Sequence, residues 1–308
     1  MGEGLGLSKD KEGGVQDTAR GILYLVATPI GNLADFSFRA VETLQKVDLI
    51  AAEDTRHSRP LLDRYGIAKP TVALHEYNEA ATAPRLIDRL VRGESVALIS
   101  DAGTPLINDP GFPLVRLARE RGIRVTPVPG PCAMVAALSA SGLPCDRFAF
   151  EGFPPRTGAA RRSHLKTLLD DQRTLIFYES SHRVLEFAKD IAAVFPKERP
   201  LVIARELTKR YETIVRTAAG EASALIEADP DMCKGEFIIL IQGAPTTKAR
   251  NELTPDQTRI LELLLAEVSV KTAAALTAKI TGARKDVAYR AALRIAEERS
   301  PVFPERLS

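Results

Sequence analysis

The stretch SVALISDAGTPLINDPG, residues 95–111, decides the fold of this chain. Its apolar run Val96–Ile99 is typical of a strand that is buried in a parallel sheet. The small polar loop Ser100–Pro105 ends the strand, and its glycine lets the backbone come close to a ligand. We predict a helix over Phe112–Arg121, with Asp109 as its N-cap. Ligands of open α/β sheets bind at the carboxyl ends of strands, so this loop is either a binding site or a plain strand-to-helix connection.

The same alternation of an apolar run with a helical pattern extends from Ile22 to Val128. The predicted strands are Ile22–Ala27, Asp48–Ala52, Thr71–Leu74, Val96–Ile99 and Arg124–Val128. Strands that alternate with helices predict a parallel sheet with helices on both of its faces. An alanine-rich helix then ends at Gly142, and we assign residues 21–143 to an N-terminal α/β domain.

Residues 144–243 have a different pattern, which predicts a second, smaller α+β domain. Leu201–Leu207 and Glu212–Val215 are predicted strands with only a short connection between them, as expected for a hairpin. Two neighbouring strands without an intervening helix indicate a mixed sheet.

The two ends of the chain differ from these domains. Residues 1–20 are glycine-rich and charged without periodicity, and we predict a disordered tail there. Residues 250–300 have a helical pattern interrupted at Gly282, with six basic residues and one acidic residue from Lys271 to Arg294. This pattern fits either a basic module resembling a helix-turn-helix or a solvated helical appendage.

The composition is that of an ordinary globular protein. Charged residues make up 27% of the chain and the formal net charge is +2, so a nucleic-acid surface has to be a local patch. The sequence has neither an apolar run of membrane-spanning length nor a hydrophobic signal segment. Three cysteines without a C-x-x-C pattern are typical of reduced thiols in the cytoplasm, and four histidines without ligand spacing predict no metal site.

Six segments of the chain carry a family resemblance. They are LYLVATPIGNLADFSFRA (23–40), AAEDTRHS (51–58), SDAGTPLINDPG (100–111), PVPGPCAMVAAL (127–138), LIFYESSHR (175–183) and ARELTK (204–209). In this order and spacing they closely resemble the bacterial 16S ribosomal RNA (cytidine-2′-O)-methyltransferases, a branch of the tetrapyrrole methylase superfamily. The resemblance covers about residues 22–242, with a weaker similarity in the basic helical tail.

The resemblance implies a tetrapyrrole-methylase-like fold of two domains with a small C-terminal helical module. It implies a cytoplasmic homodimer that binds S-adenosylmethionine between the domains and methylates a cytidine 2′-hydroxyl in the 16S RNA of the small ribosomal subunit. Two other functions stay open: a precorrin-type tetrapyrrole methyltransferase and a non-enzymatic RNA-binding protein. Thr28–Asn32 carries fewer glycines than the corresponding turn of tetrapyrrole-modifying relatives, which disfavours the first of these.

The predicted cofactor site combines loops at strand ends with residues that the resemblance adds. Backbone groups and the Asp101 carboxylate can bind polar groups of the cofactor, and Leu106 and Ile107 can flank its adenine. The full predicted set is Pro29, Gly31, Asn32, Ser100, Asp101, Ala102, Gly103, Thr104, Leu106, Pro131, Cys132, Ala133, Phe177, Tyr178, Ala204, Gly235 and Glu236.

A ribose hydroxyl is a poor nucleophile, so a positioned base would assist its attack. Four candidate bases follow from the sequence: Asp54, Glu179, Glu206 and Lys209. Lys209 qualifies only if burial lowers the pKa of its ammonium group. Glu53 precedes Asp54 at the end of the second predicted strand, and a structural ion pair is the alternative to a catalytic role for it.

Arginine and lysine side chains are candidates for contacts with RNA phosphates, because guanidinium groups match phosphate oxygens. The candidates are Arg56, Arg59, Arg161, Arg162, Arg183, Arg205 and, in the helical tail, Lys285. A solvated charged surface is the alternative explanation for such a run of charges.

Overall fold

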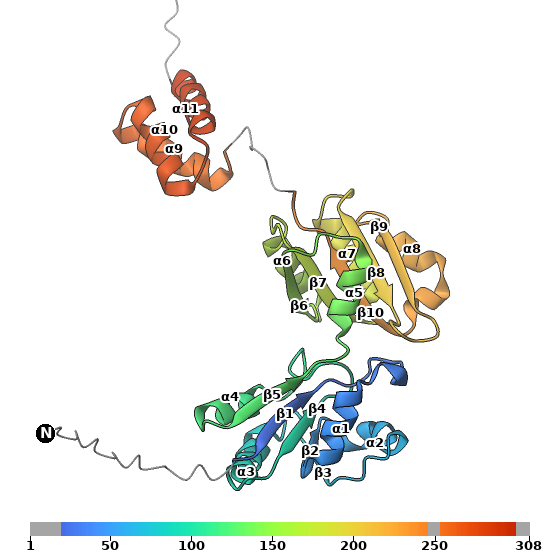
Figure 1. Ribbon diagram of the computed structural model, residues 1–308. Coiled ribbons are helices and arrows are strands. Elements are labelled where there is room, and N and C mark those ends of the chain that lie inside the picture. The colour runs from blue at the N-terminus through green and yellow to red at the C-terminus, as the bar shows by residue number, and fades with distance from the viewer. Residues whose placement is uncertain (1–19, 246–252, 300–308) are drawn as a thin grey trace, which may run out of the picture. The chain divides into compact units, whose positions relative to one another are not determined.

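The structure is a computed structural model that describes residues 20–245 and 253–299 (Figure 1). The chain forms two compact units, residues 1–244 and 245–308. The first unit has two lobes, each built on a five-stranded sheet. The predicted tail at residues 1–20 lies outside the described residues except for Arg20.

The N-terminal lobe contains a wholly parallel sheet in the order β3-β2-β4-β1-β5. Its strands are β1 (Ile22–Val26), β2 (Leu49–Ala52), β3 (Thr71–Ala73), β4 (Val96–Ile99) and β5 (Arg124–Val128). All four residues of β4 are buried, as the apolar run predicts for a strand covered on both faces. β4 lies in the middle of the sheet, and the loop after it opens at the sheet's carboxyl edge.

Helices cover both faces of this sheet, which confirms the predicted fold class. On one face, α1 (Phe38–Lys46) and α2 (Thr55–Arg64) bury residues such as Leu44 and Leu62 against Ile50. On the other, α3 (Glu79–Val91) and α4 (Phe112–Glu120) bury Leu86 and Leu114 in a second cluster. A short 3₁₀ helix, η1 (Leu33–Asp35), follows β1.

The second lobe contains a mixed sheet in the order β6-β7-β10-β8-β9. Its strands are β6 (Phe148–Gly152), β7 (Thr174–Ser180), β8 (Pro200–Arg205), β9 (Thr213–Ala218) and β10 (Glu236–Ile241). Only β6 and β7 pair in parallel, and the predicted hairpin is present as the antiparallel pair β8–β9. The mixed sheet that the sequence predicts is thus confirmed.

Each face of the second sheet packs against different helices. One face is covered by α6 (Gly158–Thr167), α7 (Val184–Val194), α8 (Ala222–Ala228) and the 3₁₀ helix η2 (Pro230–Cys233). The other face packs against α5 (Ala133–Ser141), whose Ala137 and Leu138 contact the cluster around Val202. The helix α5, which the sequence pattern assigns to the N-terminal domain, thus packs on the sheet of the second lobe.

The second unit consists, within its described residues, of three helices around a small alanine-rich core. They are α9 (Pro255–Glu267), α10 (Val270–Thr281) and α11 (Lys285–Arg299). Thr254 and Gln257 form a capping box at the start of α9, and Gly282 ends α10 in the left-handed conformation, at φ 72°. None of the described helices, in either unit, has the length and apolar character that a membrane span requires.

Candidate functional site

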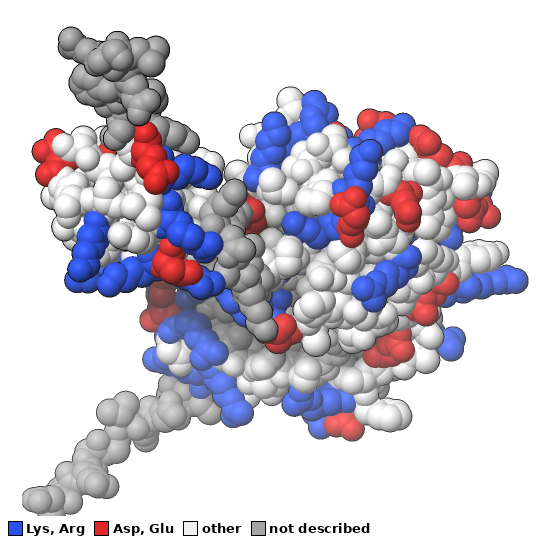
Figure 2. Space-filling view, turned by 90° about the horizontal axis from the view of Figure 1, so that it is seen from above, with Lys and Arg blue, Asp and Glu red and all other residues white. Residues whose placement is uncertain are grey.

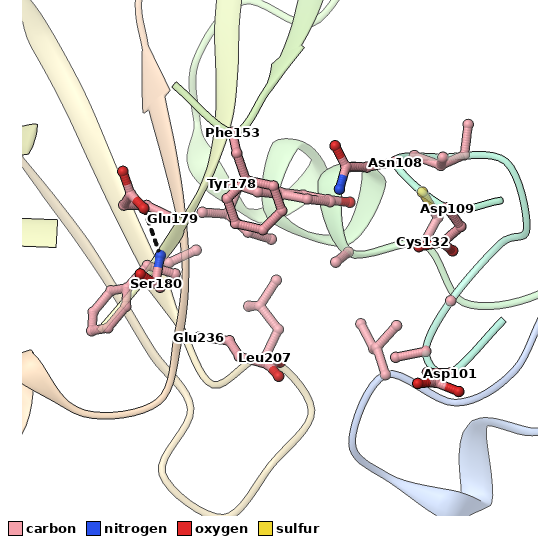
Figure 3. Close-up of a pocket in the computed structure, with 18 of the residues that line it drawn as sticks. Asp101, Asn108, Asp109, Cys132, Phe153, Tyr178, Glu179, Ser180, Leu207 and Glu236 are labelled. Atoms are coloured by element: carbon pink, nitrogen blue, oxygen red, sulfur yellow. Dashed lines mark hydrogen bonds between the residues drawn. The ribbon is translucent and has the colours of Figure 1, made fainter. Parts of the chain in front are cut away.

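A cavity of about 380 Å³ lies between the two lobes (Figure 3). The N-terminal lobe contributes the loop after β4, and the second lobe contributes Tyr178 on β7, Ala204 on β8 and the start of β10. Two backbone hydrogen bonds between Thr28 and Gly103, of 2.8 and 3.1 Å, hold the β4 loop beside the end of β1. The cavity thus opens at the carboxyl edge of the parallel sheet, where ligands of α/β proteins bind.

The last part of the β4 loop adopts a backbone conformation that side chains disfavour. Leu106 and Asn108 have φ angles of 73° and 66°, and Gly111 has φ 124°. Gly111 is also the N-cap of α4, so the prediction that Asp109 caps this helix is wrong. A Cβ atom at Gly111 would lie 2.5 Å from Leu98 Cδ2, which explains why glycine occupies this position. Asp109, released from capping, lines the cavity.

Three carboxylates line the N-terminal side of the cavity: Glu53, Asp101 and Asp109. The Asp101 Oδ1 atom accepts a hydrogen bond from the Asp54 amide at 3.1 Å, and Glu53 Oε2 accepts one from the Asp101 amide at 3.4 Å. Burial, together with the charge of Glu53, raises the pKa of Asp109 to about 7, and burial also raises the pKa of Glu53. A cation in the cavity would stabilise the ionised form of each of these carboxyls.

Aromatic side chains from the second lobe form the opposite wall. The Tyr178 hydroxyl accepts a hydrogen bond from the Met134 amide at 3.1 Å, and its ring meets Phe150 and Phe153 edge to face. Burial raises the pKa of Tyr178 to about 12, so the hydroxyl stays protonated near neutral pH. This wall is apolar with one neutral polar group, which suits the face of a heterocycle.

A second cavity, of about 520 Å³, adjoins the first. It is lined by the loop after β1, by residues 56–58 and Pro60–Leu61 of α2, and by Lys209 from the turn after β8. Four residues line both cavities: Ile30, Asp101, Ala102 and Glu236. The two cavities therefore meet at the end of β4 and the start of β10.

The structure brings most of the predicted cofactor residues to these cavities. Those that line the first cavity are Asp101, Ala102, Gly103, Thr104, Cys132, Ala133, Tyr178, Ala204, Gly235 and Glu236. Pro29, Gly31 and Ser100 line only the second cavity. Asn32, Leu106 and Pro131 line neither, although the Pro131 carbonyl accepts a hydrogen bond from the Thr104 hydroxyl. Leu106 packs against the N-terminal core, and its neighbour Ile107 lines the cavity instead.

Phe177 and Glu179 lie on the face of β7 opposite Tyr178. Phe177 is completely buried and packs against Phe187, so its side chain lines neither cavity, and only its backbone is left to fulfil the prediction that Phe177 belongs to the cofactor site. The backbone of Glu179 lies near the cavity, but its carboxylate points away from Asp101 (Figure 3) and lies 3.1 Å from the guanidinium of Arg183. Its position therefore argues against a role as the base.

Lys209 and Glu206 lie in the turn between β8 and β9, where Glu206 and Thr208 have positive φ angles of 49° and 65°. Lys209 Nζ donates hydrogen bonds to Glu206 Oε1 at 2.9 Å and to Glu236 Oε2 at 3.0 Å. Burial alone would lower the pKa of Lys209, but these two carboxylates outweigh it and raise the pKa. Lys209 was a candidate base only if its pKa were lowered, and the structure raises it. Burial raises the pKa of Glu206, but the ion pair with Lys209 outweighs burial and lowers it, so Glu206 is a weak base.

Asp54 caps α2 and does not line either cavity. Its carboxylate accepts a hydrogen bond from the Arg56 amide and pairs with the Arg56 guanidinium, both at 2.8 Å. These hydrogen bonds hold the pKa of Asp54 well below its usual range. Asp54 is therefore an N-cap rather than a group poised to accept a proton.

The predicted RNA contacts divide by exposure. Arg161 and Arg205 are buried at 5% and 8% exposure, bound to Asp190 and to the Lys234 carbonyl, and their burial argues against phosphate contact. Arg162 pairs with Asp190, and Arg183 donates to the Pro154 carbonyl. The exposed candidates are Arg162, Arg56 and Arg59 on α2, and Lys285, which begins α11. Basic and acidic side chains are interspersed on the face shown in Figure 2.

Two family models and the curated relatives of this chain indicate the same family. The sequence model of the tetrapyrrole (corrin/porphyrin) methylases matches residues 22–223, and that of the RsmI C-terminal HTH domain matches residues 251–296. The chain is 52% identical over 278 residues to the ribosomal RNA small subunit methyltransferase I of Escherichia coli O157:H7, covering 90% of this chain and 96% of that protein.

Solved structures share the fold of the first unit at low identity. Diphthine synthase has a TM-score of 0.56 and 15% identity, covering 72% of this chain and 90% of that one. Uroporphyrin-III C-methyltransferase from Thermus thermophilus, complexed with S-adenyl homocysteine, has a TM-score of 0.50 and 18% identity, covering 71% and 97%.

Proposed function

This chain belongs to the tetrapyrrole methylase family and, within it, to the ribosomal RNA small subunit methyltransferase I proteins, and on that premise we propose its reaction. The protein transfers a methyl group from S-adenosylmethionine to the 2′-hydroxyl of a cytidine in the 16S RNA of the small ribosomal subunit. The observation that carries this proposal is the acidic cavity between the lobes, in a chain about half identical to named rRNA methyltransferases.

The residues of the first cavity fit S-adenosylmethionine. When bound, this cofactor supplies an electrophilic methyl group on a positively charged sulfur, and its amino-acid end carries an ammonium group. Glu53, Asp101 and Asp109 present carboxylates to such cations, and they relieve their mutual repulsion by binding one. Tyr178 and Phe153 provide the apolar surface that an adenine needs.

The acceptor hydroxyl has to lose a proton as its oxygen forms the new bond, and a side chain at the junction of the cavities is best placed to accept it. Asp101 and Glu236 are the ionisable side chains that line both cavities. Glu236 is already paired with Lys209, whereas the hydrogen bond to Asp101 comes from a neutral amide. We assign proton acceptance to Asp101 on this ground.

The partners follow from the same proposal. The substrate is the small ribosomal subunit or its RNA, the active species is a homodimer, and the enzyme works in the cytoplasm. Sedimentation of the purified protein tests the dimer, since a monomer at all concentrations would contradict it.

The reaction itself is tested with S-adenosylmethionine labelled in the methyl group. The purified protein is incubated with small subunits from cells that lack its gene, and in parallel with a precorrin-type acceptor. We expect label in the ribosomal RNA, at a cytidine ribose. Label only in the tetrapyrrole would replace the proposal with the alternative enzyme. RNA binding without any calorimetric signal from S-adenosylmethionine would indicate a non-enzymatic RNA-binding protein.

A further inference from the structure

The segment 153–156, which follows β6, shapes the first cavity from the second lobe. Phe153 lines the cavity while it is 50% exposed, and its ring meets Tyr178 edge to face, with 5.9 Å between the ring centroids (Figure 3). Gly152, just before it, reaches the other lobe, because a Cβ atom there would lie 3.2 Å from Asn108 Oδ1 of the β4 loop. The segment therefore borders the cavity where the two lobes meet.

Main-chain hydrogen bonds do not hold this segment in place. Pro154 and Pro155 have no N–H group to donate. Among the main-chain N–H groups of the described residues, none donates to the carbonyls of Pro154, Pro155 or Arg156. The position of Phe153 therefore depends on the side chains that bind these three carbonyls.

Arg183 binds two of the three carbonyls. Its Nη2 atom donates to the Pro154 oxygen at 2.6 Å and to the Pro155 oxygen at 3.3 Å. The shorter distance is typical of a charge-assisted hydrogen bond. The third carbonyl, of Arg156, accepts a hydrogen bond from Arg161 Nη1 at 3.3 Å. Arg183 is thus the main anchor of the segment.

Glu179 holds Arg183 on the side away from the cavity. Its side chain is completely buried, on the face of β7 opposite Tyr178, and its carboxylate lies 3.1 Å from Arg183 Nη2. A buried carboxylate needs a cationic partner, so this pair fixes the position of the guanidinium. Two neighbouring residues of β7 therefore act on the same wall: Tyr178 contacts Phe153 directly, and Glu179 acts through Arg183.

We propose that Arg183 is a positioning residue, which fixes the segment 153–156 so that the Phe153 ring stays against Tyr178 as a wall for the adenine of the cofactor. The proposal rests on the proposed function, because it gives the anchored wall a role in binding S-adenosylmethionine. Arg183 lines neither cavity, so it acts on the cofactor only through Phe153.

The experiment is a double-mutant cycle between Arg183→Met and Phe153→Ala, with the dissociation constant of S-adenosylmethionine measured by calorimetry. The control is Arg199→Met. Arg199 is a buried arginine of the same lobe that also donates to two main-chain carbonyls, of Leu169 and Gln242, but it lines neither cavity. Unfolding of each variant in urea records the loss of stability separately from the loss of binding.

We expect Arg183→Met and Phe153→Ala each to raise the dissociation constant about tenfold, in the range of one lost aromatic contact. The double variant should also show a loss of about tenfold, because Arg183 has nothing left to position once the Phe153 ring is removed. In both single variants, kcat for small subunits at saturating cofactor stays within about threefold, since the wall binds adenine and not the reacting atoms. Arg199→Met should lower stability and leave the dissociation constant within about twofold.

The cycle separates positioning from a purely structural role. If Arg183 acted on the fold alone, the two effects would multiply to about 100-fold in the double variant, and such a product overturns the proposal. An affinity of Arg183→Met equal to that of Arg199→Met overturns it as well.

A second variant covers the case in which Arg183→Met does not fold. Arg183→Lys keeps a charge for Glu179 but lacks the planar guanidinium, so we expect a loss of about threefold that again disappears in the Phe153→Ala background. Either an unchanged affinity or a multiplied loss overturns the proposal in that cycle.

Failure of this proposal is distinct from failure of the proposed function. If the unchanged protein binds no S-adenosylmethionine or labels no small-subunit RNA, the proposed function is wrong. If it does both, and the substitutions at Arg183 and Phe153 act independently, the proposed function stands and Arg183 is a structural residue only.

Discussion

The two adjoining cavities share a wall and differ in how their charges are balanced. In the first, Glu53 and Asp109 are close enough for their negative charges to repel, and burial raises the pKa of both. In the second, the ammonium group of Lys209 is paired with two carboxylates, Glu206 and Glu236, at 2.9 and 3.0 Å. The first cavity therefore has carboxylates without a counter-ion, whereas a carboxylate pair at the second already holds a cation.

The largest effect is expected at Asp101, which lines both cavities. Asp101→Asn keeps the shape and hydrogen-bonding capacity of the side chain but removes a carboxylate and the proposed proton acceptor. We expect the rate of methyl transfer to fall by about 10²- to 10⁴-fold. Asp101→Ala should also weaken cofactor binding while the protein stays folded. Single-turnover kinetics and calorimetry measure the two effects, and an unchanged cofactor affinity in Asp101→Ala would remove Asp101 from the first cavity's function.

Gly31→Ala tests whether the cavities can be perturbed separately. A Cβ atom there displaces Lys209, so KM for small subunits should rise about tenfold while cofactor affinity changes little. Gly66→Ala is the matched control, because Gly66 also has a positive φ, of 64°, but a Cβ atom there meets nothing within 4 Å. Equal kinetic effects of both variants would show that backbone strain, rather than Lys209, causes the change.

The pH dependence of cofactor binding should follow Asp109. Its pKa is raised to about 7, so the carboxyl is protonated below that pH and ionised above it. Because a cation favours the ionised form, affinity for S-adenosylmethionine should increase as the pH rises from about 6 to about 8. Calorimetry on Asp109→Asn should show a flat profile, and a profile that keeps its slope would assign the titration to another group.

The titration of Asp109 lowers the free energy of unfolding as the pH rises, whereas it raises the affinity for the cofactor. Between its ordinary pKa and about 7, Asp109 holds a proton in the folded state and loses it on unfolding, so the free energy of unfolding decreases as pH rises through this window. Without cofactor, Asp109→Asn should therefore be more stable than the unchanged protein at pH 8, by about 1 kcal/mol after allowance for solvent screening. The two should unfold alike near pH 4 in urea titrations.

The smallest effect is expected at Lys285, at the start of α11 in the second unit. If this unit contacts RNA phosphates, Lys285→Ala weakens binding of small subunits less than about tenfold and lowers the salt slope by about one. Lys46→Ala, an exposed lysine at the end of α1, serves as the control. Identical salt slopes for both variants would favour a solvated helical appendage without a role in RNA binding.

The sequence predicts the sheet and its carboxyl edge because local apolar runs such as Val96–Ile99 indicate buried strands. It does not say which face of a strand meets the ligand. Side chains alternate along β7, so Phe177 and Glu179 share one face and Tyr178 lies on the other. The period of a strand therefore predicts that the side chain of only one of Phe177 and Tyr178 faces the cavity, and this signal is present in the sequence.

Other features of the site depend on contacts between distant residues. Arg161 is buried because Asp190, 29 residues later, pairs with it, and a charge run on α6 gives no sign of that partner. The sequence does not predict that Ser58 and Asp109 line the cavities, because their positions also depend on contacts with distant residues. A serine inside a helix carries no signal of an unused hydroxyl, and the positive φ of Gly111, which frees Asp109 from capping, depends on packing against Leu98.

The common wall of the cavities has a practical consequence for chemical probes. Since Ile30, Asp101, Ala102 and Glu236 belong to both cavities, one molecule can occupy both if a short linker joins an adenosine to a cytidine nucleotide. The second half would then bind at an effective concentration in the millimolar range, without losing translational freedom again. A protonated amine at the junction of such a bisubstrate ligand would be bound by the carboxylates of Asp101 and Glu236.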